Sequence, residues 1–446
     1  MKYLIKNVNI VNEGEIFTND VLIDGEIISK IDRTIDNDTN ATEINGEGLL
    51  LMPGAIDDQV HFREPGLTHK GEIYTEAKAA VAGGVTSYME QPNTNPPAIT
   101  VEELEKKYSR AAQCSLANYS FLMGTTNSNY DELQKVDYSK VAGVKIFMGS
   151  STGNMLVDDK KALENVFTNV NAIIVTHCED DPMIKERQKQ LIEEYGEDLP
   201  AYFHPIIRSE EACFKSSSFA VELAKKCNTR LHVFHISTAK ELALFTNKIP
   251  LKQKRITSEV CIHHLWFNDD DYKTKGNFIK WNPSVKTEYD RAKLFEAMLD
   301  GTIDVVATDH APHTFEEKSQ PYLKAPSGGP LVQHGIQAML DFYDQKKISL
   351  EKIVEKMSHN VADLFNIENR GYIREGYYAD MVLVDLKKPQ TVSKENILYK
   401  CGWSPFEGHT FKSSIAKTFV NGHLVFNNGK FDESKFGKRL LFNRPK

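Results

Sequence analysis

Apolar and polar positions alternate at both ends of the chain, and this pattern predicts two β-rich segments. Residues 2–12 alternate, and residues 21–31 hold an Asp-Gly pair between two short apolar runs, which is the local signature of a hairpin. Near the other end, residues 379–386 have the pattern of a strand, and residues 415–430 that of a hairpin turning at an Asn-Gly pair. We expect the two segments to join in one small β-sandwich.

Between these segments, short apolar runs alternate with stretches of helical periodicity. Runs of strand length occupy residues 172–177, 231–237 and 303–310, whereas residues 101–113 and 218–227 have the pattern of helices. Strands that alternate with helices form βαβ units, and such units build a parallel sheet or barrel. The middle of the chain therefore favours an α/β fold.

The predicted organisation is an α/β chain in which a distorted TIM, or (β/α)₈, barrel interrupts a small β-sandwich domain built from both termini. Residues 53–365 would form the barrel, and residues 1–52 and 366–446 the two parts of the sandwich. The stretch from about 315 to 330, in which Gly, Pro and Ser cluster, is expected to be a long barrel loop. A chain of 446 residues is long enough for one large domain and one small one.

Composition and charge exclude several other classes of protein. Hydrophobic residues make up 41% and charged residues 26%, which is typical of a folded globular protein. The net charge of −8, without a block of Lys and Arg, argues against a nucleic-acid partner. There is no signal-peptide pattern and no apolar run of about 18 residues, so we expect no membrane association and a cytoplasmic location. The six cysteines form no C-x-x-C pair and are expected to be reduced, buried thiols.

Side chains able to bind a metal follow several of the short apolar runs. A barrel places its active site there, at the carboxyl ends of the strands. Each histidine alone is more simply a core or surface residue, but their joint placement favours a zinc site, since neutral imidazoles and carboxylates suit zinc. Two zinc ions would polarise a carbonyl and activate a water, as hydrolysis of an amide requires. The positions are Gln59-Val60-His61, Lys145, His177, His235 and Asp309.

Seven separate motifs resemble those of dihydroorotases, a group of cyclic amide hydrolases in the amidohydrolase superfamily. They cover essentially the whole predicted barrel, in the order that the family has. The resemblance implies reversible ring closure of N-carbamoyl-L-aspartate to L-dihydroorotate, a step of pyrimidine synthesis, on a small-molecule substrate. The motifs lie at residues 54–72, 91–97, 143–148, 176–180, 232–238, 280–286 and 300–318.

The resemblance also implies roles for the metal-binding side chains. His61 would bind one zinc ion, called α, and His177 and His235 the other, called β. Lys145, carbamylated by CO₂, would bridge the two, which requires the amine to lose its proton. Asp309 would bind the α metal and move the proton between water and the ring nitrogen. The plainer alternatives are a surface lysine for Lys145 and a structural carboxylate for Asp309.

A second set of residues would recognise the substrate. Arg63, two positions beyond the histidine of the first motif, would bind the ring carboxylate through a bidentate fork. By resemblance, Asn93 and His313 would complete this clamp, although an asparagine in a turn-rich segment could equally cap a turn. Asn282 would contact the ring amide, and the backbone of residues 326–329 the edge of the pyrimidine.

The chain departs from the family at the first motif, where Gln59 replaces the first histidine of an H-x-H pair. A glutamine oxygen is a weaker ligand than imidazole, so one tightly held zinc ion is expected, and the second ion is expected to be held weakly or not at all. A catalytically impaired scaffold therefore stays an alternative, although the retained Lys145, Arg63 and Asp309 argue against it. The other alternative is a hydantoinase, dihydropyrimidinase or allantoinase, whose substrates lack the ring carboxylate. The sequence also leaves open whether the chain forms a homo-oligomer.

Overall fold

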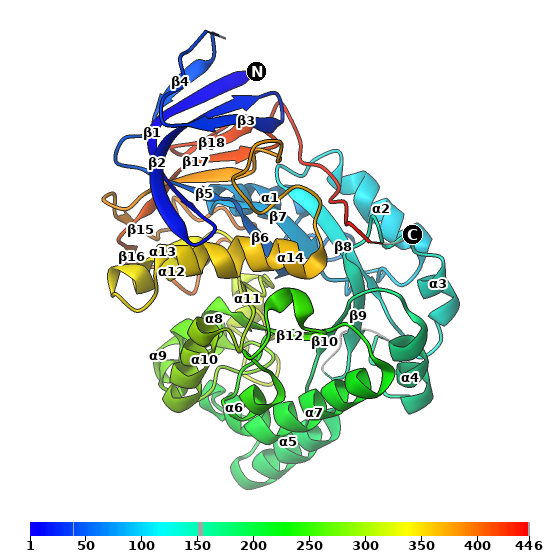
Figure 1. Cartoon of the computed structure of the whole chain (residues 1–446). Coiled ribbons are helices and arrows are strands. Elements are labelled where there is room, and N and C mark those ends of the chain that lie inside the picture. The colour runs from blue at the N-terminus through cyan, green and yellow to red at the C-terminus, as the bar shows by residue number, and fades with distance from the viewer. Residues whose placement is uncertain (39, 150–154, 445–446) are drawn as a thin grey trace.

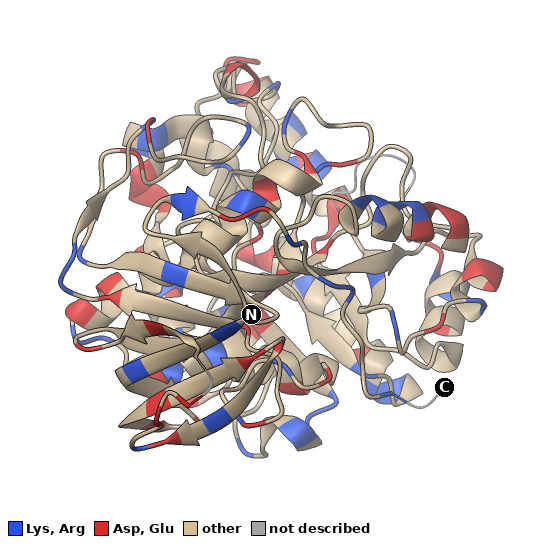
Figure 2. Cartoon of the chain, turned by 90° about the horizontal axis from the view of Figure 1, so that it is seen from above, with Lys and Arg blue, Asp and Glu red and all other residues tan. Residues whose placement is uncertain are grey.

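The computed structural model describes residues 1–38, 40–149 and 155–444. Figure 1 shows a barrel of strands and helices with a smaller β-rich part, built from the two ends of the chain, packed on one side of it. Lys and Arg segments are interspersed with Asp and Glu segments in the view of Figure 2. No described helix is long and apolar enough to cross a membrane.

Eight parallel strands form the wall of the barrel, and they neighbour one another in chain order. The first strand meets the segment just after the last one, where Val60 forms a parallel bridge with His310 and the His61 N–H donates to the His310 carbonyl at 2.7 Å. The wall is thus nearly closed, and the predicted distorted barrel is confirmed. Its strands are β6 (Ala55–Val60), β7 (Val85–Glu90), β8 (Asn118–Gly124), β9 (Gly143–Phe147), β10 (Ile174–His177), β11 (Leu231–Val233), β12 (Ile256–Cys261) and β13 (Val305–Ala307).

Helices connect these strands and lie outside the wall (Figure 1). Their ends follow from local chemistry: Ser209 caps the start of α7 by accepting from the Ala212 N–H, and Asn228 ends it in the left-handed conformation. The helices are α1 (Ile73–Ala82), α2 (Val101–Ala111), α3 (Tyr130–Gln134), α4 (Lys160–Asn169), α5 (Asp181–Tyr195), α6 (His204–Ile207), α7 (Glu210–Cys227), α8 (Ile262–Trp266), α9 (Tyr272–Lys275), α10 (Glu288–Asp300), α11 (Phe315–Lys318), α12 (Gly335–Asp344), α13 (Leu350–Val354) and α14 (Asn360–Phe365).

A nine-stranded, mostly antiparallel sheet joins the two ends of the chain. The junction is the pairing of β5 with β14, where Leu51 lies opposite Leu383. The rings of Tyr3 and Phe419, three strands apart, have centroids 5.3 Å from each other, so the sheet curls around its own apolar core. The small domain built from both termini is thereby confirmed. Its strands are β1 (Lys2–Asn12), β2 (Glu15–Asp24), β3 (Ile27–Asp32), β4 (Thr42–Asn45), β5 (Leu50–Pro53), β14 (Met381–Asp385), β17 (Ser414–Val420), β18 (His423–Asn427) and β19 (Lys430–Phe431), with β15 (Gln390–Thr391) and β16 (Thr410–Phe411) forming a separate pair.

Details of the sequence prediction need two corrections. Cys227 and Cys401 are only partly buried, although all six cysteines are free thiols as expected. Cys227 is the last residue of α7 and Cys401 lies in a turn, and both pack against the edge of the apolar core rather than inside it. The stretch from 315 to 330 begins with a turn of helix, α11, because Thr314 caps it by accepting from the Glu317 N–H. The remainder of that stretch is irregular and reaches the barrel mouth.

Candidate active site

A cavity of about 250 Å³ lies at the carboxyl ends of the barrel strands. It brings together every side chain that the sequence analysis placed in the site, although these come from segments spread along the chain from Gln59 to His313. Phe147, Trp281, Ala311 and the loop at residues 326–328 complete the wall. The predicted residues in it are Gln59, His61, Arg63, Asn93, Lys145, His177, His235, Asn282, Asp309 and His313.

Two buried histidines face each other across this cavity. Nδ1 of His177 lies 2.9 Å from Nε2 of His235, and the other His177 nitrogen, Nε2, lies 2.9 Å from a carboxylate oxygen of Glu179. Burial lowers the pKa of both imidazoles, so both are neutral near pH 7. Burial alone would raise the pKa of Glu179, but its ion pair with Arg208 and its bond to His177 lower it to about 2. The carboxylate therefore fixes the ring so that Nδ1 points into the cavity.

Lys145 ends inside the cavity among aromatic rings. Its Nζ lies 4.2 Å from the ring centroid of Phe234 and 4.9 Å from that of Phe147, and only 1% of the residue is exposed. Burial lowers the pKa of this amine to about 8, and the nearby Asp309 carboxylate opposes the shift. A measurable fraction of Lys145 is therefore uncharged near neutral pH, which is the form that reacts with CO₂.

His61 and Asp309 form the opposite side of the polar cluster. Nδ1 of His61 lies 2.9 Å from Oδ1 of Asn93, and its Nε2 lies 3.2 Å from Oδ1 of Asp309. Asn93 accepts from the His61 ring, so it orients this imidazole in addition to lining the cavity. Burial raises the pKa of the Asp309 carboxyl to about 7, against the opposing charges of Lys145 and Arg63. Such a group exchanges protons readily near pH 7.

Three of these side chains sit on unusual backbone. Arg63, His235 and Asp309 have φ angles of 71°, 41° and 46°, in the left-handed region that residues other than glycine rarely adopt. Each lies two or three residues after the end of a barrel strand, where the chain turns out of the wall. Non-glycine residues held in this region cluster at functional sites in proteins. The three observations therefore mark the same place as the polar cluster does.

Gln59 lines the cavity next to a thiol. Its Oε1 accepts from Sγ of Cys261 at 3.6 Å, and the same thiol lies 3.3 Å from Oε1 of Glu259. A thiol has one hydrogen, so the two acceptors share a weak donor. The Gln59 oxygen is drawn toward Cys261, behind the cavity wall, which is unfavourable for a metal ligand in the place of the missing histidine.

Arg63 and His313 form a second polar group in the cavity. Nε of Arg63 donates to the Pro312 carbonyl at 3.0 Å, and Nη2 lies 3.1 Å from Nε2 of His313. Burial lowers the pKa of Arg63 only to about 10, so it stays charged at pH 7. Nζ of Lys70 lies 3.0 Å from Nδ1 of His313, and Nε2 of the same ring also lies 3.0 Å from the Ser327 carbonyl oxygen. A fixed cation thus faces the cavity.

The side-chain amide oxygen of Asn282, Oδ1, is buried and accepts no hydrogen bond from a described residue. Buried acceptors are rarely left without a donor. Since Asn282 lines the cavity, a ligand N–H is the natural donor. This observation fits the contact with a ring amide that the sequence resemblance implies.

Sequence reasoning missed several side chains that hold the cluster in place. Glu179 supports His177, and Glu259 accepts from the backbone N–H of His235 at 3.1 Å. The indole N–H of Trp281 donates to the carbonyl of Asp309 at 3.3 Å. A signal existed for Glu259, because it is an acidic residue inside an apolar strand, and for Glu179, which lies two positions after His177.

The barrel, the cavity and its imidazole, carboxylate and lysine groups define this chain as a barrel hydrolase. A sequence profile of the amidohydrolase family matches residues 50–425. The dihydroorotase of Staphylococcus epidermidis is 33% identical over 443 residues, covering 96% of this chain and 100% of that protein. The dihydroorotase of Bacillus subtilis is 33% identical over 441 residues, covering 96% and 99%.

Solved structures show the same architecture. The dihydropyrimidinase of Brevibacillus agri has a TM-score of 0.90 at 25% identity and covers 100% of both chains. The L-hydantoinase of Arthrobacter aurescens has a TM-score of 0.92 at 25% identity, covering 98% of this chain and 99% of that one. The chain belongs to the amidohydrolase family, and within it groups with the dihydroorotases. The sequence resemblance is thereby confirmed.

Proposed function

We propose that this chain is a dihydroorotase, which interconverts N-carbamoyl-L-aspartate and L-dihydroorotate with uptake or release of water. The observation that carries the proposal is the placement of the charged Arg63 in the same cavity as the histidines and Asp309. Dihydroorotate bears a carboxylate outside its ring, and a guanidinium fork matches a carboxylate. We further propose that the reaction serves pyrimidine synthesis in the cytoplasm, with the small molecule as the partner.

The chain's own groups supply most of the required chemistry. Arg63, with His313 beside it, would hold the ring carboxylate, and the free oxygen of Asn282 would accept from the ring N–H. Asp309 would take a proton from the attacking water in hydrolysis and give it to the leaving ring nitrogen, and the reverse in ring closure. Its pKa of about 7 suits both directions.

Zinc fits the donor set on chemical grounds. His177, His235 and a carbamylated Lys145 would hold the β ion, and His61, Asp309 and the same lysine the α ion. The neutral imidazoles and the His177–Glu179 bond are the arrangement that zinc-binding histidines need. Zinc would supply polarisation of the scissile carbonyl and activation of water.

The purified protein is expected to hold about one zinc ion per chain tightly and the second weakly, since Gln59 leaves the α position one imidazole short. Gln59→His should raise the content toward about two per chain, because it restores two imidazoles two residues apart. The measurement is elemental analysis after the same mild chelator wash. Two chelator-resistant ions in the unaltered protein would show that another group replaces the missing histidine.

Carbamylation of Lys145 should depend on pH. Because burial lowers the pKa of the amine to about 8, the uncharged form grows as pH rises and dominates above that value. We expect the uptake of ¹³C-labelled CO₂ by the metal-free protein to increase from pH 6 to about 8 and then to level off. NMR detection of the carbamate carbon tests this, with Lys145→Met as the control that should lose the signal.

Substrate specificity separates the proposal from its rivals. Purified protein, supplied with zinc and bicarbonate, is assayed on dihydroorotate, hydantoin, dihydrouracil and allantoin. Turnover of dihydroorotate alone or by far the best is expected. Turnover of hydantoin or dihydrouracil with none of dihydroorotate would assign the chain to the hydantoinase type, and no turnover of any substrate would support an impaired scaffold.

A further inference from the structure

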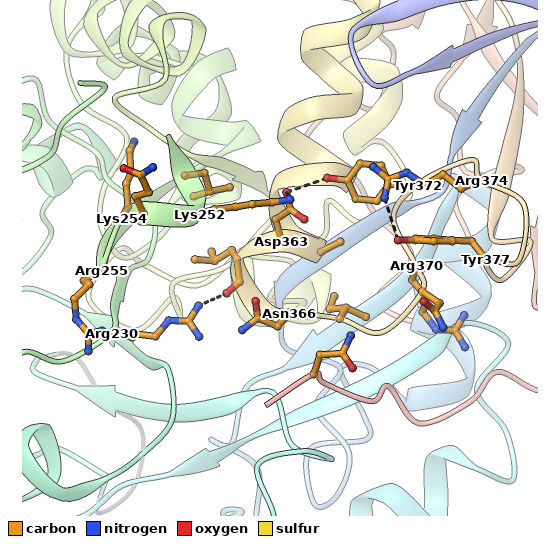
Figure 3. Close-up of a pocket in the computed structure, with 17 residues that line it drawn as sticks. Arg230, Lys252, Lys254, Arg255, Asp363, Asn366, Arg370, Tyr372, Arg374 and Tyr377 are labelled. Carbon is orange, nitrogen blue, oxygen red and sulfur yellow. Dashed lines mark hydrogen bonds and ion pairs between the residues drawn. The ribbon is translucent and has the colours of Figure 1, made fainter. Parts of the chain in front are cut away.

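A second hollow, of about 770 Å³, lies at the amino-terminal end of the barrel strands. Figure 3 shows Arg230 and Arg255 on one side of it and Arg370 and Arg374 on the other. Six cationic side chains line the hollow, and Asp363 is the one acidic residue among the described residues that line it. The protein as a whole carries a net charge of −8, so this concentration of positive charge is local.

Four of the six cations have carboxylate partners. Lys252 lies 3.5 Å from Asp363, and Lys254 lies 2.6 Å from Asp304. Arg370 pairs with Asp380, and Arg374 with Glu13. These four charges are balanced within the protein.

Arg230 and Arg255 differ from the other four, because their hydrogen-bond acceptors in the described part of the chain are neutral. Nη2 of Arg230 donates to the Leu364 carbonyl at 2.6 Å, and Arg255 donates to the Asn228 carbonyl. In the described residues neither side chain forms an ion pair with a carboxylate. Arg230 directly precedes β11 and Arg255 directly precedes β12. Because these two strands pair in parallel, both arginines lie at the same end of the barrel.

A third guanidinium extends this group. Arg444 lines an adjoining hollow together with Arg230 and Arg255. It too donates to carbonyls, those of Ala142 at 2.7 Å and Phe365 at 2.8 Å. Burial lowers its pKa to about 9, and the charge of Arg230 contributes to that shift. Like charges held together without a counter-charge cost free energy that a bound anion would remove.

We propose that this hollow binds a phosphorylated small molecule of nucleotide size, with its phosphates against Arg230 and Arg255. The guanidinium fork matches the geometry of a phosphate, and two adjacent forks favour a ligand with two or more negative charges. The volume lies in the range of sites for ligands of that size. Amide and hydroxyl groups of Asn366, Asn369 and Tyr377 in the remaining wall suit the neutral part of a nucleotide.

The site is separate from the candidate active site. Arg230 stands at the start of β11, whereas His235 follows the end of the same strand at the other face of the barrel. The anion would therefore not compete with dihydroorotate, and the inference does not depend on the proposed function. Its location at the base of a strand that leads to His235 makes an effect on the metal site testable as well.

Isothermal titration calorimetry of the full chain tests the proposal with UTP, ATP, pyrophosphate, inorganic phosphate and uncharged adenosine, compared at one ionic strength and then again with added salt. We expect affinity to rise with the number of phosphates, to be undetectable for adenosine, and to weaken as salt is added. Arg255→Gln and Arg230→Gln should each weaken triphosphate binding by about tenfold or more, since each removes hydrogen bonds to a charged group. Arg33→Gln, an exposed arginine after β3, is the matched control and should leave binding unchanged.

Three outcomes of these titrations would overturn the proposal, and a fourth comes from a variant of the candidate active site. The first three are no heat with any phosphate compound, binding that survives Arg255→Gln unchanged, and equal binding of adenosine. Arg255 is exposed, so its substitution remains informative even if Arg230→Gln perturbs folding. Loss of binding in Arg63→Met would place the anion in the candidate active site instead and would also contradict the inference.

Discussion

Asp309→Asn is expected to lower kcat for dihydroorotate hydrolysis by about 10³-fold or more. A loss of this size is typical of removing a general acid–base catalyst. The amide keeps the shape of the side chain but has no proton to exchange near pH 7. It is also a poorer metal ligand than a carboxylate. The loss should appear in both directions of the reaction, because the same group gives and takes the proton. Steady-state assays of hydrolysis and of ring closure measure it.

The control for this variant flanks the same strand, β13, at the end opposite to Asp309. Asp304 precedes β13 at its other end, is buried, and pairs with Lys254 at 2.6 Å. Asp304→Asn removes a buried carboxylate of the same type far from the cavity, so it should change stability while kcat stays within about threefold. An Asp309→Asn enzyme that is folded, retains its tightly bound zinc and keeps more than about a tenth of the activity would refute the proton-transfer role.

Much of the fold could be predicted, because the spacing of apolar residues within each short segment indicates a strand or a helix. The hairpin at residues 415–430 forms as expected, since Asn421 and Gly422 adopt φ angles of 49° and 70°, which the tight turn between antiparallel strands requires. The alternation of strands and helices likewise predicted the barrel. The closure of the wall between Val60 and His310 could not be predicted from spacing, because it depends on the tilt and register of all eight strands.

The residues of the candidate site that lie in sequence motifs could be predicted. The neighbours that contact them only through tertiary packing could not. His61, His177 and Asp309 lie at or just after strand ends in recognisable motifs, so their convergence on one cavity was predicted. The neighbours of these residues were not. The thiol of Cys261 reaches Gln59 from a segment 202 residues away, and such a contact leaves no mark in either local sequence.

The basic hollow at the base of the barrel illustrates the same limit. Its cations come from three separate segments of the sequence, namely the residue before β11, residues 252–255 before β12, and the segment after α14. Only the folded chain shows which of them are balanced by carboxylates. Charge pairing is a tertiary property, so a motif search cannot find a site of this kind.

Arg63→Met is expected to weaken the use of dihydroorotate strongly, by roughly 2 to 5 kcal/mol in kcat/KM, the range for removing one partner of a desolvated charge pair. The side chain is buried, carries its charge at pH 7, and is fixed by its bond to the Pro312 carbonyl. An apolar thioether would face the substrate carboxylate in its place. Arg63→Lys should give an intermediate loss, because it restores the charge without the bidentate fork.

The decisive readout for Arg63 is specificity and not activity alone. A merely structural role would lower turnover of every substrate together and would alter the zinc content. A carboxylate-binding role should lower kcat/KM for dihydroorotate while any residual rate on dihydrouracil, which lacks the carboxylate, stays unchanged and zinc is retained. The loss in kcat/KM should appear mainly as a higher KM if the contact is equally strong in the ground state and the transition state. A Met variant within about threefold of the unaltered protein on dihydroorotate would show that another group binds the carboxylate.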